Sequence, residues 1–138
     1  MFIVDTDTMT FLQRGHTRVT ERFRLAGRQV VTTVISRIEI LTGRFAAIMK
    51  AADGDQLRRT QHWLEQSEKH LRRVPILAVD DAAAAEFDRL RQNKKLKKIG
   101  RGDLLIASVA LAKQATLITR NLKDFRQVPG LQIENWAD

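Results

Sequence analysis

One stretch of the sequence decides the fold: Gly102-Asp103-Leu104-Leu105-Ile106-Ala107-Ser108-Val109-Ala110-Leu111, with Thr116-Leu117-Ile118-Thr119 shortly after it. Residues 104–111 are apolar on nearly every side of a helix, which predicts a helix buried among other elements. Residues 116–119 form a short apolar and β-branched run, which predicts a strand. A buried helix that leads into a strand is typical of α/β folds, in which helices cover a parallel sheet.

The same alternation extends from this stretch along the rest of the chain. We expect further strands at residues 2–4, 30–35, 75–79 and 131–133, where short apolar or β-branched runs occur. Apolar positions with helical spacing predict helices at residues 8–13, 19–26, 38–48, 57–71 and 83–90. Strands separated by helices imply right-handed crossovers, so we predict a single α/β domain over residues 1–138 with a mainly parallel sheet.

Composition limits the classes of function. The chain carries 24 Lys and Arg against 16 Asp and Glu, a formal charge of +8, which favours polyanionic partners. These basic residues are spread along the chain, so a solvated surface without a ligand is the alternative. The absence of cysteine excludes disulfides and thiolate chemistry. No apolar run is long enough to span a membrane, and we expect a cytoplasmic protein without a membrane partner.

Acidic and amide residues fall where predicted strands end. Asp5 ends the first strand, Glu39 lies one turn into the helix after the second strand, and Asp103 opens the buried helix. Asn121 and Asp124 follow the strand at residues 116–119. Because ligands of open parallel sheets bind beyond the carboxyl ends of the strands, these side chains are the candidates for a functional site.

These residues also have structural interpretations. Asp5 and Asp103 are candidates for helix N-caps, Ser36 and Glu39 have the spacing of a capping box, and Asn121 is a candidate turn cap. Three carboxylates at one edge would nevertheless repel one another unless a cation lay between them. Mg²⁺ or Mn²⁺, which prefer oxygen ligands, is the simplest such cation. A basic protein with an acidic metal site suits metal-assisted hydrolysis of a phosphodiester.

At these residues the sequence resembles the PIN domain, and within it the VapC-type toxins of bacterial toxin–antitoxin pairs. The matching segments span nearly the whole chain in the family's order. They are Asp5-Thr6-Asp7, Ile35-Ser36-Arg37-Ile38-Glu39-Ile40-Leu41-Thr42-Gly43, Gly102-Asp103-Leu104-Leu105-Ile106-Ala107, Leu117-Ile118-Thr119-Arg120-Asn121-Leu122-Lys123-Asp124-Phe125 and Val128-Pro129-Gly130-Leu131-Gln132-Ile133-Glu134-Asn135-Trp136. The resemblance implies a parallel sheet of four to five strands flanked by helices.

The resemblance also implies roles for individual residues. Asp5, Glu39 and Asp103 match the family's three core carboxylates, which bind Mg²⁺ or Mn²⁺ in the catalytic site. Asn121 stands where some members carry a fourth acid, so the number of metal ions stays open, and Asp124 is close enough in sequence to complete the site.

Several polar residues are predicted to bind substrate. Around the acids they are Thr6, Ser36 and Arg120. The least structured predicted stretch, residues 92–102, adds five basic residues as predicted phosphate contacts: Lys94, Lys95, Lys97, Lys98 and Arg101. A solvated loop is the alternative for these five residues.

The implied activity is that of a metal-dependent endoribonuclease. A water activated by the metal would attack phosphorus and leave 5′-phosphate and 3′-hydroxyl ends, with structured RNA such as tRNA as the substrate. The resemblance further implies a homodimer and a cognate antitoxin that covers the active-site groove. Exposed apolar positions on the helix at residues 57–71 are candidates for such an interface.

Two other functions remain open at this point. A non-catalytic PIN-like module would bind RNA or a protein without cleaving. A haloacid-dehalogenase-type phosphatase would use Asp5-Thr6-Asp7 and the later pair Asp80-Asp81. This chain, however, has Met9 where that family has Thr, and such a function would leave Glu39 and Asp103 unexplained.

Overall fold

A parallel sheet of five strands forms the centre of the molecule. The strands are β1 (Phe2–Val4), β2 (Val30–Thr33), β3 (Ile76–Leu77), β4 (Thr116–Ile118) and β5 (Gln132–Glu134). In the computed structural model, which describes residues 1–138, they lie in the order β3-β2-β1-β4-β5 and every neighbouring pair is parallel. The predicted α/β class and parallel sheet are confirmed.

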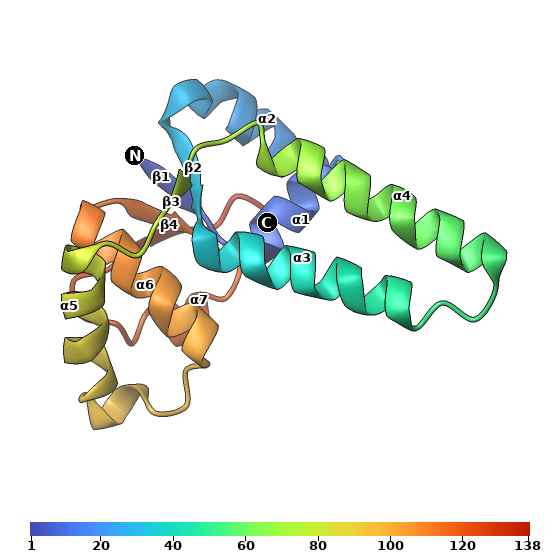
Figure 1. The fold of residues 1–138 in the computed structure, drawn as a ribbon. Helices are drawn as coiled ribbons and strands as arrows, with labels where there is room; N and C mark the ends of the chain where they lie inside the picture. The colour runs from blue at the N-terminus through green and yellow to red at the C-terminus, as the bar shows by residue number, and fades with distance from the viewer.

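Helices connect the strands and cover both faces of the sheet (Figure 1). The α-helices are α1 (Thr6–Gln13), α2 (Thr17–Ala26), α3 (Val34–Met49), α4 (Gly54–Leu71), α5 (Asp81–Arg91), α6 (Arg101–Lys113) and α7 (Leu122–Phe125). Two short 3₁₀ helices, η1 (Gly27–Gln29) and η2 (Lys94–Leu96), complete the chain. The six longer α-helices were predicted, whereas α7 and the 3₁₀ turns were not.

The core is divided by the sheet into two apolar clusters. Ile3 and Leu117 belong to the cluster under α5 and α6, while their neighbours Val4 and Ile118 belong to the cluster under α1 and α2. Successive residues of a strand point to opposite faces, so each central strand contributes to both clusters. Burial on both faces is what a parallel sheet requires. Helix α6 is buried as predicted, with six of its thirteen residues inaccessible.

Two predicted element boundaries are wrong for one reason. The strand expected at residues 30–35 ends at Thr33, whose hydroxyl accepts a hydrogen bond of 3.1 Å from the backbone N–H of Ser36 and so caps α3. Ser36 is therefore already inside the helix, and the capping box expected from Ser36 and Glu39 is not formed. This shift leaves the carboxylate of Glu39 free for other contacts.

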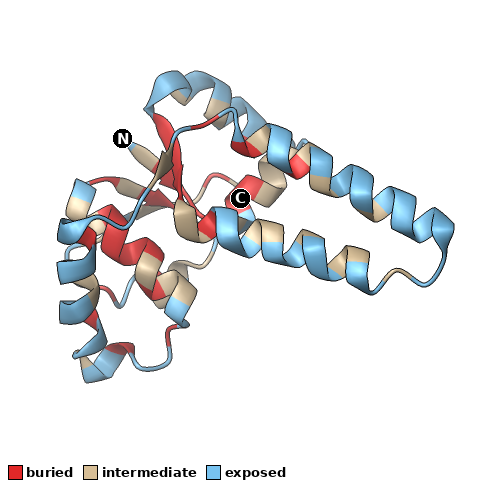
Figure 2. Ribbon diagram, in the orientation of Figure 1, coloured by how far each residue is buried: buried red, intermediate tan, exposed pale blue.

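Helices α3 and α4 pack against each other and project from the sheet as a long arm, defined here as residues 34–71 (Figure 1). Most of the arm is exposed (Figure 2). Of the predicted leucine stripe on α4, Leu71 at the base is buried and Leu57 near the tip is exposed. None of the helices combines the length and the apolar character that crossing a membrane requires. The arm also exposes four further large apolar side chains, Ile38, Phe45, Met49 and Trp63.

Candidate active site

Asp5 stands at the carboxyl end of the central strand β1. Its side chain caps α1 by accepting a hydrogen bond of 2.9 Å from the Thr8 backbone N–H, so the N-cap interpretation is correct. Asp5 is 5% exposed, and this burial raises the pKa of its carboxyl above the ordinary 3.8, against hydrogen bonds from Thr119 and Thr8 that lower it. A buried carboxylate without a cationic partner is costly, which is unusual for a residue that serves only as a cap.

Glu39 reaches the same edge of the sheet from the exposed face of α3. The Thr6 hydroxyl donates a hydrogen bond of 2.6 Å to Glu39 Oε1 and also lies 3.0 Å from the Ser36 hydroxyl. The other oxygen, Oε2, is 2.7 Å from the position that a Cβ atom would take on Gly102. Any larger residue at position 102 would displace this carboxylate, so the glycine lets α3 and the start of α6 approach.

Asp103 projects from the first turn of α6. The N-cap of this helix is Gly100, which has no side chain, so the expected capping role of Asp103 is wrong. Burial raises the pKa of the Asp103 carboxyl above 3.8, and the charges of Asp5 and Glu39 raise it further. The charges of carboxylates from three separate elements therefore influence one another.

Asn121 links two of the acids instead of capping α7. Its Nδ2 donates to Asp124 Oδ2 at 3.0 Å and lies 3.4 Å from Asp103 Oδ2, while its side chain makes no capping bond. The Asn121 backbone N–H donates to the Thr119 hydroxyl at 3.0 Å. The negative charge of Asp124 adds to the forces that raise the pKa of Asp103. Asn121 and Asp124 thus lie beside the acids, and one amide group is shared between two carboxylates.

The site carries excess negative charge. None of Asp5, Glu39, Asp103 and Asp124 forms an ion pair with a lysine or arginine. No three of the chain's carboxylate and histidine side chains are drawn together tightly enough to enclose a metal ion by themselves. Mg²⁺ commonly keeps several water ligands and uses only one or two carboxylates, so an open set of oxygen donors fits it.

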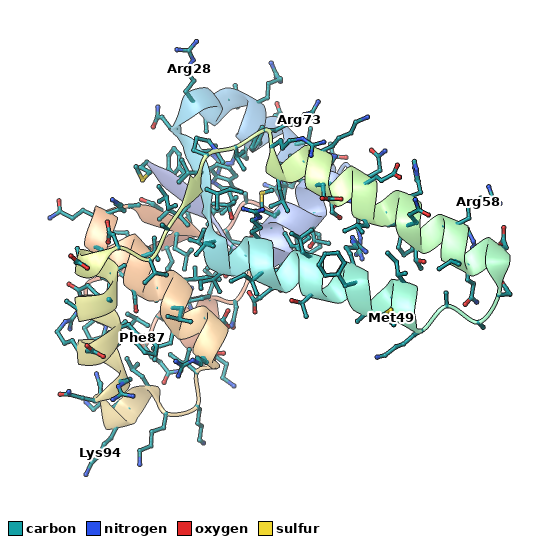
Figure 3. All side chains as sticks on the ribbon, viewed as in Figure 1. Arg28, Met49, Arg58, Arg73, Phe87 and Lys94 are labelled. Atoms are coloured by element: carbon teal, nitrogen blue, oxygen red, sulfur yellow. The ribbon has the colours of Figure 1, made fainter.

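The predicted basic residues lie in different surroundings. Lys94, Lys95, Lys97 and Lys98 are exposed on and around η2, and Figure 3 places Lys94 at the end of the molecule away from the arm. The guanidinium of Arg101 lies 5.1 Å from the centre of the Phe87 ring. Together with Lys97, Arg101 lines a cavity of about 430 Å³ beside α5. No contact joins these residues to the acids, and their binding to phosphates stays a prediction.

Arg120 is already engaged within the chain. Its Nε lies 3.4 Å from Asp138 Oδ2, and its guanidinium lies 5.7 Å from the centre of the Phe11 ring. Substrate binding by Arg120 would require exchange of an exposed ion pair, which is a weak interaction.

Three functional positions escaped the sequence interpretation. Thr8 and Thr119 hydrogen-bond to Asp5, and Gly102 makes room for Glu39. The threonines were assigned only to a helix and a strand. The bond from Thr8 is a local cap three residues after Asp5, whereas Thr119 lies at the end of a neighbouring strand, where a side-chain contact leaves no periodic signal. Gly102 was placed only at the end of the least structured predicted stretch, residues 92–102, although its position next to Asp103 was the available signal for a close approach.

The acidic pair required of a phosphatase is used elsewhere. Asp80 caps α5 by accepting a hydrogen bond of 3.0 Å from the Ala83 backbone N–H, and it pairs with Lys113 Nζ at 3.2 Å. Asp81 lies in the first turn of the same helix. Asp80 and Asp81 therefore have helix-terminal roles, and the phosphatase interpretation loses its second motif.

The known proteins that this sequence resembles are VapC nucleases. Ribonuclease VapC2 from Rickettsia felis is 41% identical over 68 residues, about half of each chain (48% of this chain and 51% of that protein). The tRNA(fMet)-specific endonuclease VapC from Salmonella typhimurium is 25% identical over 99% of this chain and 98% of its own length.

Solved structures agree with these relatives. VapBC2 from Rickettsia felis, bound to a DNA fragment from its promoter, contains a chain with a TM-score of 0.80 and 25% identity over 98% of both chains. VapBC-5 from Mycobacterium tuberculosis, a member of the VapBC family of toxin–antitoxin systems, matches with a TM-score of 0.51 and 29% identity over 77% of this chain and 79% of that one. The PIN domain itself matches residues 2–131. This match covers nearly the whole chain and agrees with its five-stranded parallel sheet. The chain therefore belongs to the PIN-domain family and is similar to its VapC ribonucleases.

Proposed function

We propose that this protein is a VapC-type endoribonuclease that depends on Mg²⁺ or Mn²⁺. One observation supports the proposal most strongly: the charges of Asp5, Glu39 and Asp124 all act on Asp103, and none of these four acids forms an ion pair with a lysine or arginine. Membership of the PIN-domain family and similarity to ribonucleases support the choice of RNA as substrate. The similarity to a tRNA(fMet)-specific endonuclease makes tRNA the first substrate class to test.

Each residue of the site has a role in this proposal. Asp5, Asp103 and Glu39 would hold the ion, with Asp124 as a further acid at the rim. A bound divalent ion supplies the positive charge that activates water and stabilises phosphate oxygens during phosphodiester hydrolysis. Asn121 shares its amide protons between Asp103 and Asp124 and so fixes the orientation of both.

The hydroxyl of Thr6 has a positioning role. It holds one oxygen of Glu39 at 2.6 Å and is itself next to Ser36, which is fully buried. A carboxylate on an exposed helix face would otherwise sample several rotamers, and fixing one of them on ligand binding would cost side-chain conformational entropy. Thr6 and Ser36 therefore hold Glu39 toward the site, and their predicted contact with substrate is a further part of the proposal.

The proposed partners are a cognate antitoxin and a second copy of this chain. The similarity to solved VapBC proteins supports an antitoxin. Exposed apolar side chains on the arm, among them Phe45 and Trp63, supply the kind of surface that protein partners cover. Size-exclusion chromatography with light scattering, with and without co-expressed antitoxin, measures both associations.

Incubation of the purified protein with total cellular RNA tests the activity. With Mg²⁺ we expect defined new 5′-phosphate ends after sequencing, and with EDTA we expect none. Asp103→Ala is the matched inactive control. RNA binding without any Mg²⁺-dependent cleavage would contradict the proposal and favour a non-catalytic module of the same fold.

A further inference from the structure

A groove leads away from the acidic site between α1 and α3. Its first part, a cavity of about 240 Å³, is lined by Thr6, Thr10, Arg14, Glu39, Gly43 and Arg44, among others. A second hollow of about 160 Å³ is lined by Gln13, Arg14, Arg44 and Trp63. The two cavities share Arg14 and Arg44 as lining residues and so lie side by side; together we name them the α1–α3 groove.

The helices set the direction of this groove. Thr6, Thr10 and Arg14 are four residues apart on α1 and its C-cap, and Glu39 and Gly43 are four apart on α3, so each set lies along one face. At 1.5 Å per residue, Arg14 lies about 12 Å along α1 from Thr6. Arg44 lies about 7 Å along α3 from Glu39. Both arginines thus lie further along their helices than Thr6 and Glu39, on the side that leads away from the acids.

Arg44 is held in place by a part-buried polar network. Its Nε donates a hydrogen bond of 3.0 Å to the Ser67 hydroxyl, which in turn donates to Gln13 Oε1 at 3.0 Å. Ser67 is 1% exposed, so this bond is protected from water. The Trp63 ring centre lies 5.4 Å from the Arg44 guanidinium. The network fixes the planar group while using only one of its nitrogens.

Neither arginine of the groove has a carboxylate partner. Arg14 and Arg44 form no ion pair, whereas Arg58 and Arg59 near the arm tip both pair with Asp55. Arg14 and Arg44 line the same two cavities, so the two positive groups lie near each other. Burial lowers the pKa of Arg44, and the charge of Arg14 lowers it further. Two adjacent, uncompensated guanidiniums form a binding site for a doubly coordinating anion such as a phosphate.

We propose that Arg14 and Arg44 bind a backbone phosphate of the RNA strand whose scissile phosphate lies at Asp5, Glu39 and Asp103. This inference rests on the proposed function for the position of the scissile phosphate. Continuity of the groove favours RNA over an acidic protein segment, because one strand then places neighbouring phosphates at the acids and at the arginines. Gly43 lines the groove, and a Cβ atom there would meet no other atom within 4 Å, so the space beside it is open to a ligand.

Binding of a short single-stranded RNA of about 12 nucleotides, measured by fluorescence anisotropy in EDTA, tests the inference without cleavage. Arg14→Gln with Arg44→Gln should lower affinity roughly ten- to a hundredfold. The slope of log K against log salt should become shallower by about 0.7 for each phosphate that the variant no longer neutralises. Arg28→Gln is the matched control, because Arg28 is exposed on η1, has no ion pair and lies outside the groove (Figure 3).

Two further measurements locate the bound phosphate. In a set of RNAs, each phosphate is replaced singly by a neutral methylphosphonate. We expect one particular replacement to weaken binding to the wild-type protein, and the same replacement to leave binding to the double variant unchanged. Gly43→Leu should weaken RNA binding through bulk alone, because leucine favours the helix and leaves both arginines in place.

The outcomes separate this inference from the proposed function. Equal RNA affinity of the wild-type protein and the double variant overturns the phosphate site even if Mg²⁺-dependent cleavage is observed, and leaves the groove to an acidic protein segment. Arginine-dependent binding without cleavage supports the phosphate site and contradicts the nuclease. Failure of the wild-type protein to bind RNA in EDTA overturns the phosphate site, whereas only the absence of Mg²⁺-dependent cleavage overturns the nuclease.

Discussion

Helices α6 and α4 differ strongly in how much of their length is buried. Six of the thirteen residues of α6 are buried, whereas only Ser67 and Leu71 are buried among the eighteen residues of α4 (Figure 2). Helix α6 carries Asp103 at its start and is fixed against the sheet along its length. Helix α4 is fixed mainly at its base, and its exposed part lies along the arm.

This difference assigns separate tasks to the two regions. The sheet and α6 hold acidic groups in fixed positions, which a metal site requires because its ligands tolerate little displacement. The arm presents apolar and basic side chains to solvent, which suits the binding of large partners. We therefore expect changes around α6 to affect stability or catalysis strongly, and changes near the arm tip to affect partner binding first.

The largest expected effect is on catalysis. Asp103→Ala removes a central carboxylate of the site, and we expect RNA cleavage to fall about a thousandfold or more. Arg58→Ala, at the exposed end of the arm (Figure 3), should leave the cleavage rate within about twofold of the wild type, as expected of a surface position. Initial rates at fixed Mg²⁺ provide the comparison. Equal losses in both variants would contradict the separation of the two regions.

The next effect is on stability. Ile106 on α6 is fully buried, so Ile106→Ala should lower the free energy of unfolding by about 3 kcal/mol, because it removes buried apolar surface and leaves a cavity. Leu57→Ala on the arm, where the side chain is 47% exposed, should change it by about 0.5 kcal/mol or less. Urea denaturation followed by circular dichroism measures both values. A large loss for Leu57→Ala would show that the arm is covered in solution, for instance by a second copy.

The sheet with α6 could be predicted from the sequence, whereas the arrangement of the arm could not. The five strands and α6 were all predicted at the right places, with ends that differ by up to three residues, because continuous apolar runs allow few other placements. The sequence placed Asp5 and Glu39 after two strands of one parallel sheet and Asp103 at the start of the buried helix, and the charges of Asp5 and Glu39 do act on Asp103; a shared metal site stays a prediction. Periodicity could not reveal that α3 and α4 leave the sheet as an arm, because one apolar stripe suits a sheet, a neighbouring helix or a partner equally well.

Local side-chain contacts were the other limit. Hydrogen bonding of Thr33 moved the start of α3 and removed the expected capping box. Gly100 replaced Asp103 as the N-cap of α6. The pairing of Arg44 with Ser67 joins residues 23 positions apart, and no sequence pattern marks that contact.

A smaller effect should appear on the arm itself. Gly43 lies inside α3 with open space where a Cβ atom would be, so Gly43→Ala should raise the free energy of unfolding by about 0.5–1 kcal/mol through helix propensity. Thermal unfolding by calorimetry measures the gain. A loss of stability would mean that the groove beside Gly43 is filled in solution.

The smallest effect concerns the charge of Asp103. Its raised pKa means that the folded state binds the proton more tightly than the unfolded chain, so ionisation lowers stability as the pH rises through the folded-state pKa. Asp103→Asn should therefore stabilise the metal-free protein at pH 7 by about 0.5 kcal/mol, a value reduced by solvent screening. The gain should vanish below the ordinary pKa of 3.8, where both forms are neutral. A gain that is independent of pH would contradict the electrostatic cause.

Calorimetric titration of the RNA-free protein with Mn²⁺ at pH 7 tests the central claim most directly. If the three acids form one site, the wild-type protein binds Mn²⁺, and Asp5→Asn, Glu39→Gln and Asp103→Asn each weaken that binding about tenfold or more. Mn²⁺ affinity that is unchanged by all three substitutions would contradict a shared metal site.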